Sequence, residues 1–346
     1  MSAAERVTVV VDALGGDNAP GVVLQGVAEA LAADPKLQIL LTGPEDVVTA
    51  FASVNERVDA VTTTEVIEMG EHPASAVRSK KDSSIVVGCR LVKEGKAEAF
   101  FSAGSTGACM AAATLVMGRL HGVSRPAIAT VIPASDRPCV LLDIGANADV
   151  KPEDLVQFAL MGRAYAQVLL GRPEPTVGLL NIGEEPTKGS MLAQEAHALM
   201  AESVPGFTGN VEGRDIPAGT VDVVVTDGFT GNVVLKLLEG FSKTLLGQIK
   251  AAMTETSINS LAAAVLKPSL QKLKDRIDPD TYGGAPLLGV KGVCIIGHGS
   301  SGTRAICNGI LVSARAARAQ LPSVIERSIA ELSPESNALP RARTNV

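Results

Sequence analysis

Residues 100–119 read FFSAGSTGACMAAATLVMGR, and this stretch decides the fold class. The apolar residues 99–101 predict the end of a buried strand, and the alanine-rich residues 108–117 predict a helix. The glycine-rich loop between them, 102–107, is typical of an anion site, because unpaired amide N–H groups and the helix dipole both favour negative charge there. An ordinary turn with a Ser or Thr helix cap is the alternative.

The same design recurs along the chain. Apolar runs that lead through a polar or glycine-containing loop into a helical pattern lie at residues 7–11, 139–142, 176–180, 221–225 and 293–296. Repetition of strand, loop and helix predicts an α/β fold with a mainly parallel sheet. Ligands of such sheets lie beyond the carboxyl ends of the strands. We therefore expect the loops to converge on one edge and to form a shared active cleft.

The alternation of strands and helices along the chain predicts one α/β catalytic domain over residues 1–332, although the length alone is also compatible with two domains. Residues 240–280 predict a helical arm, residues 65–84 a long polar connection, and residues 333–346 a disordered tail. Further strands are expected at 38–41, 59–63, 127–132 and 207–211. Further helices are expected at 22–32, 85–93, 155–170 and 303–320.

Composition narrows the class of protein. The 346 residues are 46% hydrophobic, and the net charge of −6 comes from interspersed charges of both signs, which argues against nucleic acid as a partner. The five cysteines lack C-x-x-C spacing and predict free thiols in a reducing compartment. Glu5 and Asp12 flank the first apolar run, which predicts a first strand and not a signal peptide, and no run is long enough to span a membrane. A cytoplasmic protein is expected.

Two loops resemble nucleotide motifs but lack their context. Residues 183–190 fail as a P-loop because Lys188 precedes Gly189. Residues 297–302, GHGSSG, match G-x-G-x-x-G, but neither a further strand nor an acidic residue for a ribose follows. An NAD-dependent dehydrogenase therefore stays a minor alternative. The sequence has no G-x-S-x-G and no Cys/His metal spacing, so we expect neither metal nor cofactor.

The loops suit a reaction in which an anion is itself the nucleophile. Phosphate needs positioning and charge neutralisation, and a thioester under attack needs donors for its developing oxyanion. The expected catalytic residues are Lys188, Asp227, Asn232 and His298. Helix caps and Asx turns are the competing interpretation of each acidic residue. The residues expected to bind phosphate or substrate are Asp12, Gly15, Gly16, Asp17, Ser102, Gly104, Ser105, Thr106, Gly107, Asp143, Asn147, Asn181, Lys236 and Ser300.

The chain carries a series of specific motifs: DALGGDNAP (12–20), SAGSTGA (102–108), LLDIGANAD (141–149), LLNIGEEPTKG (179–189), DVVVTDGFTGNVVLK (222–236), LAAAVLKP (261–268) and YGGAPLLGVKG (282–292) with HGSS (298–301). Together, and in this order over residues 7–320, they resemble the bacterial phosphate acyltransferases, which make acyl phosphate from acyl-(acyl-carrier-protein) and inorganic phosphate. Leu14 stands where that family often has Met, and Ser105 where it often has Asn.

The resemblance implies an isocitrate-dehydrogenase-like, three-layer α/β/α fold, a homodimer, and no nucleotide or metal. It also implies an early step of phospholipid synthesis, with acyl-carrier protein and inorganic phosphate as substrates. A membrane glycerol-3-phosphate acyltransferase would use the product. The alternatives are a short-chain acyl-CoA phosphate transacylase, the dehydrogenase, and a non-catalytic partner of the membrane enzyme.

Two surfaces are expected to meet partners. The basic residues Arg78, Lys80 and Lys81 are candidates for binding the acidic carrier protein, with a solvated loop as the alternative. Residues 257–274 form an apolar helical pattern flanked by lysines, which the resemblance links to peripheral attachment at the inner face of the cell membrane. Pro268 should break or restart that helix. The residues expected to contact the membrane are Leu261, Val265, Leu266 and Leu270.

Overall fold

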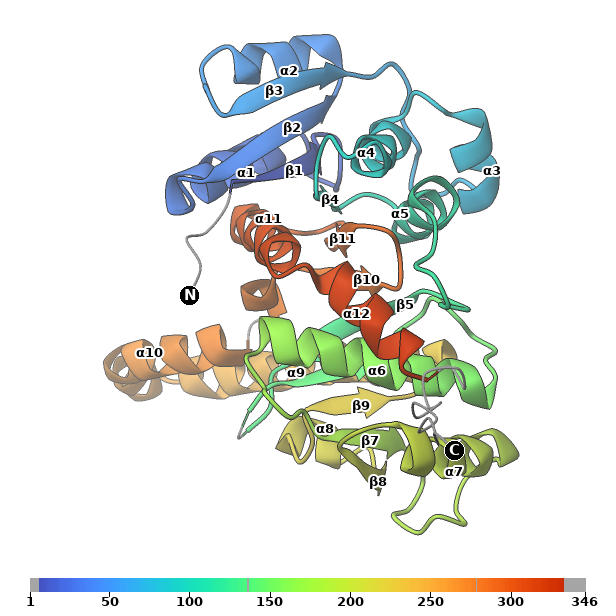
Figure 1. Cartoon of the computed structure of the whole chain (residues 1–346). Coiled ribbons are helices and arrows are strands. Elements are labelled where there is room, and N and C mark those ends of the chain that lie inside the picture. The colour runs from blue at the N-terminus through green and yellow to red at the C-terminus, as the bar shows by residue number, and fades with distance from the viewer. Residues whose placement is uncertain (1–5, 136, 278, 333–346) are drawn as a thin grey trace, which may run out of the picture.

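The structure is a computed structural model, and it describes residues 6–135, 137–277 and 279–332. Eleven strands within these residues form one sheet in the order β3-β2-β1-β4-β11-β10-β5-β6-β9-β7-β8 (Figure 1). The strands are β1 (Val7–Asp12), β2 (Leu37–Gly43), β3 (Val58–Thr62), β4 (Ala99–Ser102), β5 (Ala127–Ile132), β6 (Cys139–Leu142), β7 (Val177–Leu180), β8 (Phe207–Val211), β9 (Val223–Val225), β10 (Ala285–Leu288) and β11 (Val293–Ile296).

The sheet is mostly parallel, as expected, but it consists of two parallel sets that run in opposite directions. The first set is β3, β2, β1, β4 and β11, and the second is β6, β9, β7 and β8. Antiparallel pairing of β10 with β11 and β5, and of β5 with β6, joins them. The loops after the strands therefore do not share one edge of a flat parallel sheet.

Twist turns outer strands of the two sets, such as β2 and β9, toward the same side. Neighbouring strands rotate by about 20–25° relative to each other. Seven steps separate β2 from β9 in the sheet order, which adds up to roughly 140–175°. The arrowheads of β2 and β9 accordingly point to the same side in Figure 1, although the two strands run in opposite senses within the sheet.

Helices cover both faces of the sheet and make it the middle of three layers. The alternation of side chains along β1 shows this, because Val9 and Val11 enter one apolar core and Val10 enters the other. The helices are α1 (Gly21–Ala33), α2 (Glu45–Ala52), α3 (Pro73–Ser79), α4 (Ser84–Lys93), α5 (Thr106–Ala112), α6 (Pro152–Leu169), α7 (Met191–Ser203), α8 (Asp215–Ala218), α9 (Gly228–Thr254), α10 (Ser257–Ile277), α11 (Thr303–Arg318) and α12 (Leu321–Ala330).

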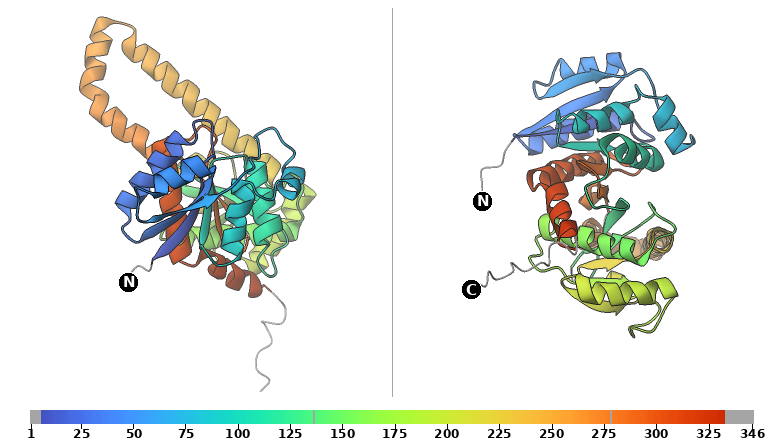
Figure 2. Two further views of the ribbon diagram at one scale, coloured as in Figure 1. Left: turned by 90° about the horizontal axis from the view of Figure 1, so that it is seen from above. Right: turned by 45° about the vertical axis from the view of Figure 1, so that its right-hand side comes forward.

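Residues 228–277 form a helical hairpin. Helices α9 and α10 project from the body and meet at a tip, as the left view of Figure 2 shows. Pro268 lies inside α10 and does not end it, so the expected break is wrong. The carbonyl of Ala264, which loses its helical N–H partner to the proline, is on an exposed stretch where water can bind it. None of the described helices has both the length and the apolarity needed to cross a membrane.

Other differences from the expected elements are local. The polar stretch 65–84 contains α3, which begins at a proline and packs against α5. The loop after β9 is short, because β9 ends at Val225 and α9 begins at Gly228. Strand β10 and helices α2 and α12 had no clear pattern in the sequence. The expected tail, 333–346, lies outside the described residues.

Candidate functional site

The loops after β1, β4 and β11 form one group. Ser102 Oγ donates a hydrogen bond of 2.8 Å to Asp12 Oδ2, and Ser102 Oγ accepts one of 3.0 Å from the Gly104 N–H. The Asp17 N–H donates to the Gly299 carbonyl at 2.7 Å, and the Gly297 N–H donates to the Ser102 carbonyl at 2.8 Å. The three loops therefore contact one another, and those after β4 and β11 lead into α5 and α11, whose first turns carry backbone N–H groups with no acceptor inside the helix.

Close backbone approach requires glycine in this group. A Cβ at Gly15 would lie 2.7 Å from the Ala103 nitrogen, which is below any real contact. Gly16 has φ of +110°, in a region that other residues rarely adopt. The glycines of the DALGGD motif therefore let two strand-end loops touch through their backbones.

The loops after β6 and β9 form a second group around Asp143. Its carboxylate accepts five hydrogen bonds, from the Ile128, Gly145, Ala146 and Asn147 N–H groups and from Asn147 Nδ2, at 2.7–3.2 Å. A Cβ at Gly228 would lie 2.6 Å from the Asn147 carbonyl oxygen. Asn232, one turn into α9, lies beside Gly145, and its side chain is exposed.

The loop after β7 carries Lys188. Asn181 Nδ2 donates to the Lys188 carbonyl at 3.1 Å, and the Lys188 N–H donates to the Glu185 carbonyl at 3.0 Å, so the loop is tied to itself. Lys188 is exposed, and Ser190 caps α7 immediately after the loop. An ammonium group therefore stands in solvent at the start of a helix, and both features favour an anion.

Burial divides the expected site residues into supports and possible ligand contacts. Asp12, Ser102, Ser105 and Asp143 are buried, the first two at 3% and 0% exposure. Their hydrogen bonds hold loops in place, so they act on a ligand through the loops. The exposed side chains of the expected set are Asp17, Thr106, Lys188, Asn232, Lys236, His298 and Ser300.

Two expected roles are taken by local structure. The Asp227 carboxylate accepts hydrogen bonds from the N–H and the hydroxyl of Thr230 at 2.8 and 2.7 Å, so it is the N-cap of α9. Lys236 forms an ion pair with Glu239 at 2.8 Å on the same helix. The competing interpretation of Asp227, a helix cap, fits the structure, and Lys236 is already partly neutralised.

The buried carboxyls have perturbed acidities. Burial raises the pKa of Asp12, against the hydroxyls of Ser84 and Ser102 and the Leu14 N–H, which lower it. Burial also raises the pKa of Asp143, against its backbone and Asn147 donors. Sequence reasoning missed Ser84, whose only signal was its place at the start of a helix after a polar stretch.

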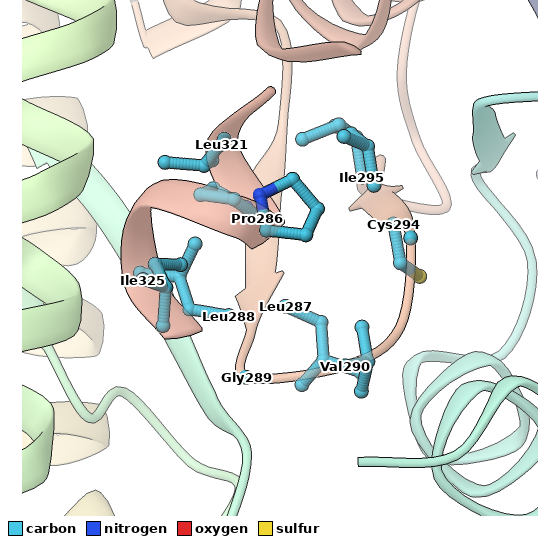
Figure 3. Close-up of a pocket in the computed structure, with 12 residues that line it drawn as sticks. Pro286, Leu287, Leu288, Gly289, Val290, Cys294, Ile295, Leu321 and Ile325 are labelled. Atoms are coloured by element: carbon cyan, nitrogen blue, oxygen red, sulfur yellow. The ribbon is translucent and has the colours of Figure 1, made fainter. Parts of the chain in front are cut away.

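Two cavities lie away from the glycine loops. A void of about 10 Å³ lies between β10, β11 and α12, and Figure 3 shows its apolar lining of Pro286, Leu288, Leu321 and Ile325. Its volume is too small for a substrate, and its apolar lining offers no polar partners for water. An open depression of about 260 Å³ with Glu98 and Lys291 lies at the amino ends of β4 and β11, opposite the loops.

One of the three basic residues expected to bind the carrier protein already has partners within the chain. Lys80 Nζ forms an ion pair with Glu71 at 2.6 Å and donates to the Val66 carbonyl at 2.7 Å. Arg78 and Lys81 are exposed. Two of the three expected cations thus face solvent, and the third holds the 65–84 segment together.

The comparisons with known proteins agree with the motifs. A family model described as "fatty acid synthesis protein" matches residues 7–324. A "phosphate acyltransferase" of Heliobacterium modesticaldum is 48% identical over 326 residues, which cover 93% of this chain and 97% of the relative. This chain belongs to the phosphate acyltransferase family. Another member, from Clostridium acetobutylicum, is 43% identical over 94% of this chain and 99% of its own length.

Solved structures share the fold at low sequence identity. A phosphotransacetylase from Staphylococcus aureus aligns with 17% identity and a TM-score of 0.56, over 90% of this chain and 94% of that one. A branched-chain phosphotransacylase from Enterococcus faecalis aligns with 16% identity and a TM-score of 0.56, over 90% and 99%. This member of the family therefore has an α/β/α architecture that solved phosphotransacylase structures also have.

Proposed function

We propose that this phosphate acyltransferase transfers a fatty acyl group from acyl-carrier protein to inorganic phosphate, an early step of phospholipid synthesis. The observation that carries the proposal is the convergence of the loops after β1, β4 and β11 at the starts of α5 and α11. Glycine loops at helix N-termini bind phosphate through backbone N–H groups. Family membership supplies the reaction class.

The reaction needs positioning more than proton transfer. A phosphate oxygen attacks the thioester carbonyl carbon, the carbonyl oxygen becomes an oxyanion, and the C–S bond breaks to give acyl phosphate and the carrier thiolate. The thiolate takes up the proton that the phosphate gives up, through solvent. Donors for the oxyanion and cations for the phosphate supply most of the rate enhancement.

The exposed residues divide these tasks. The amino-terminal N–H groups of α5, with Thr106, and the ammonium of Lys188 hold phosphate. Asn232, one turn into α9, and His298, in the loop after β11, supply polar hydrogens to the reacting centre. Removal of Lys188 or His298 should reduce kcat or kcat/KM by about 10²–10³-fold, as loss of one donor to an oxyanion does.

A direct assay tests the proposal. Purified protein is mixed with palmitoyl-carrier protein with and without phosphate, thiol release is followed, and acyl phosphate is trapped with hydroxylamine. Phosphate-dependent release together with hydroxamate is expected. Absence of both would exclude the activity and would support a non-catalytic partner of the membrane enzyme.

The rival functions appear in the same assay. A short-chain acyl-CoA transacylase would use acetyl-CoA in preference to palmitoyl-carrier protein, and the fold shared with phosphotransacetylases keeps it a candidate. A dehydrogenase would bind NAD tightly, but β11 is the last strand of the described residues, so no βαβ unit follows the GHGSSG loop. Calorimetry with NAD decides this.

We also propose that the arm joins two copies into a homodimer. Apolar side chains recur every four residues along α9, and Phe229, Leu237 and Phe241 are 63–67% exposed. A row of large apolar side chains in solvent indicates a contact surface. Phe241→Glu should shift sedimentation from dimer to monomer, whereas Gln248→Glu, which adds the same charge on the same helix, should not.

The end of the arm is proposed to meet the membrane. Leu261, Val265 and Leu266 are exposed near the tip, Leu270 is half-buried, and Lys267 stands beside them. In flotation with anionic vesicles, Leu261→Glu/Val265→Glu should remain at the bottom of the gradient. Ser257→Glu/Ser269→Glu is the matched control, and equal flotation of both double variants would remove this contact.

Contact of the arm with the membrane would determine where in the cell the enzyme acts. A cytoplasmic protein attached to the inner face of the cell membrane would release acyl phosphate where a membrane glycerol-3-phosphate acyltransferase consumes it. The two proteins should therefore co-sediment with vesicles that contain the membrane enzyme. Binding that does not depend on Leu261 and Val265 would contradict the route through the arm.

A further inference from the structure

The loop after β11 fixes the hydrogen-bonding state of His298. Its Nδ1 lies 3.2 Å from the Ser300 backbone nitrogen, which donates to it, and 2.8 Å from Ser300 Oγ. A backbone N–H can only donate, so Nδ1 carries the lone pair. A neutral imidazole has one N–H, and that proton therefore lies on Nε2.

The ring is held beside the first group of loops. On one side of His298, the Gly297 N–H donates to the Ser102 carbonyl, and on the other side Gly299 accepts from the Asp17 N–H. The His298 carbonyl accepts from the Ser301 N–H at 2.9 Å, which closes the turn. The side chain of His298 is exposed, so its Nε2–H is available to a ligand at these loops.

We propose that His298 is a hydrogen-bond donor to a substrate oxygen through Nε2–H and is not a general base, and that Ser300 is its positioning residue. This inference rests on the proposed function for the identity of the substrate. A neutral ring with a protonated Nε2 has no lone pair facing the substrate, so it cannot remove a proton there. Phosphate needs no such removal because it is already a nucleophilic anion.

The assignment also changes the role of Ser300. The sequence placed Ser300 among the phosphate ligands, but its hydroxyl and its N–H both point to Nδ1. A second donor to Nδ1 keeps the ring in one orientation and in one tautomer, as the partner of a functional histidine does. Loss of the hydroxyl should loosen the ring without removing it.

Spectroscopy tests the tautomer without any assay of activity. The chain has four histidines, so a ¹⁵N-histidine-labelled sample gives few ring signals, and His298→Gln identifies those of His298. In the neutral ring we expect protonated Nε2 and unprotonated Nδ1. A protonated Nδ1 would overturn the proposal. This result stands whether or not the protein makes acyl phosphate, so failure of the proposed function is recognised separately.

Kinetic measurements test the role of His298 as a donor and of Ser300 as its positioning residue. The amide N–H of Gln reaches about as far as Nε2–H, so His298→Gln should retain at least tenfold more kcat/KM than His298→Ala. Ser300→Ala should lower kcat/KM several-fold, and Ser300→Thr, which keeps the hydroxyl, should restore it. Ser301→Ala is the matched control with near wild-type rates. A His298→Gln variant that folds but is as slow as His298→Ala, or no rescue by Ser300→Thr, would overturn the assignment.

Discussion

Ser102 Oγ donates a 2.8 Å hydrogen bond to the Asp12 carboxylate and so joins the ends of β4 and β1. Both side chains are buried, and the Leu14 N–H donates to the other carboxylate oxygen at 3.0 Å. Ser102→Ala removes one donor from a buried carboxyl group. We expect a loss of about 1–3 kcal/mol in the free energy of unfolding.

Chemical denaturation measures this loss. Thr106→Ala is a suitable control, because its side chain is exposed at the start of α5. It should change phosphate binding more than stability. If Ser102→Ala unfolds at the wild-type urea concentration, the link between the two strands contributes nothing to the fold.

The stability of the protein should depend on Asp12 in a defined direction. Burial raises its pKa in the folded state above the ordinary value of 3.8. As pH rises from 3.8 to the folded pKa, the unfolded chain loses this proton first, so the carboxyl destabilises the fold progressively by about 1.4 kcal/mol per unit of pKa difference.

A pH series of urea unfolding tests that direction. The stability of wild type relative to Asp12→Asn should decrease as pH rises through this window, whatever constant offset the lost hydrogen bonds add. A difference that grows with pH would mean that the donors around Asp12 outweigh its burial.

Two glycine-to-alanine substitutions on α9 should distinguish the effect of a backbone clash from the effect of helix propensity. In Gly228→Ala the new Cβ would lie 2.6 Å from the Asn147 carbonyl oxygen, so the loops of the Asp143 group must move apart. We expect a loss of about 1–3 kcal/mol, as overpacking typically produces. Gly240→Ala lies on the same helix with nothing within 4 Å and should gain about 0.5–1 kcal/mol.

Thermal unfolding of both variants gives the comparison. Activity should fall in Gly228→Ala and stay unchanged in Gly240→Ala. Equal stability of the two variants would show that the backbone contact between Gly228 and Asn147 is not tight in solution.

Thiol chemistry should distinguish the cysteines. Cys89, Cys109, Cys139 and Cys294 are buried, and burial raises the pKa of Cys109 and of Cys139 to about 12. Cys307 is half-exposed. A chromogenic disulfide should therefore titrate one thiol in the native protein and five in denaturant, and Cys307→Ser should abolish the native reaction. More than one fast thiol would contradict the packing behind the glycine loops.

The strands were predictable because runs such as 7–11 and 293–296 are continuous stretches of mostly apolar residues that favour strands, and the strand-end loops followed from them. The opposite direction of the two parallel sets was not predictable, since it depends on β10, a four-residue strand with Pro286 inside it. Twist, a property of the whole sheet, then turns outer strands of the two sets, such as β2 and β9, toward the same side (Figure 1).

Side-chain roles were less predictable than loop positions. Asp12, Asp143 and Asp227 were all placed correctly at strand ends, but whether a carboxylate faces a ligand or binds a neighbouring loop or helix start depends on the donors that the fold brings to it. Asp12 meets Ser102, and Asp227 meets Thr230 three residues away. A local sequence pattern is compatible both with a helix cap and with a ligand contact, and it does not decide between them. The pairing of His298 with Ser300 has no sequence signal beyond proximity.

Charge reversal near α3 should separate binding of the carrier protein from stability. Arg78 and Lys81 are exposed, whereas Lys80 is held by Glu71 at 2.6 Å. Arg78→Glu/Lys81→Glu should slow association with the acidic carrier several-fold at low salt, with a weaker salt dependence, because steering by surface charge acts mainly on the association rate.

Lys80→Glu is the informative control. It places two carboxylates together and removes the donor to the Val66 carbonyl, so it should destabilise the 65–84 segment and raise its hydrogen exchange. The double variant should leave that exchange unchanged, because neither Arg78 nor Lys81 holds the segment through its charged group. Stopped-flow association at two salt concentrations, with hydrogen exchange on the same samples, measures both effects. If the double variant associates at the wild-type rate, the carrier protein binds at another surface, and the two cations are solvated side chains of α3 and the turn after it.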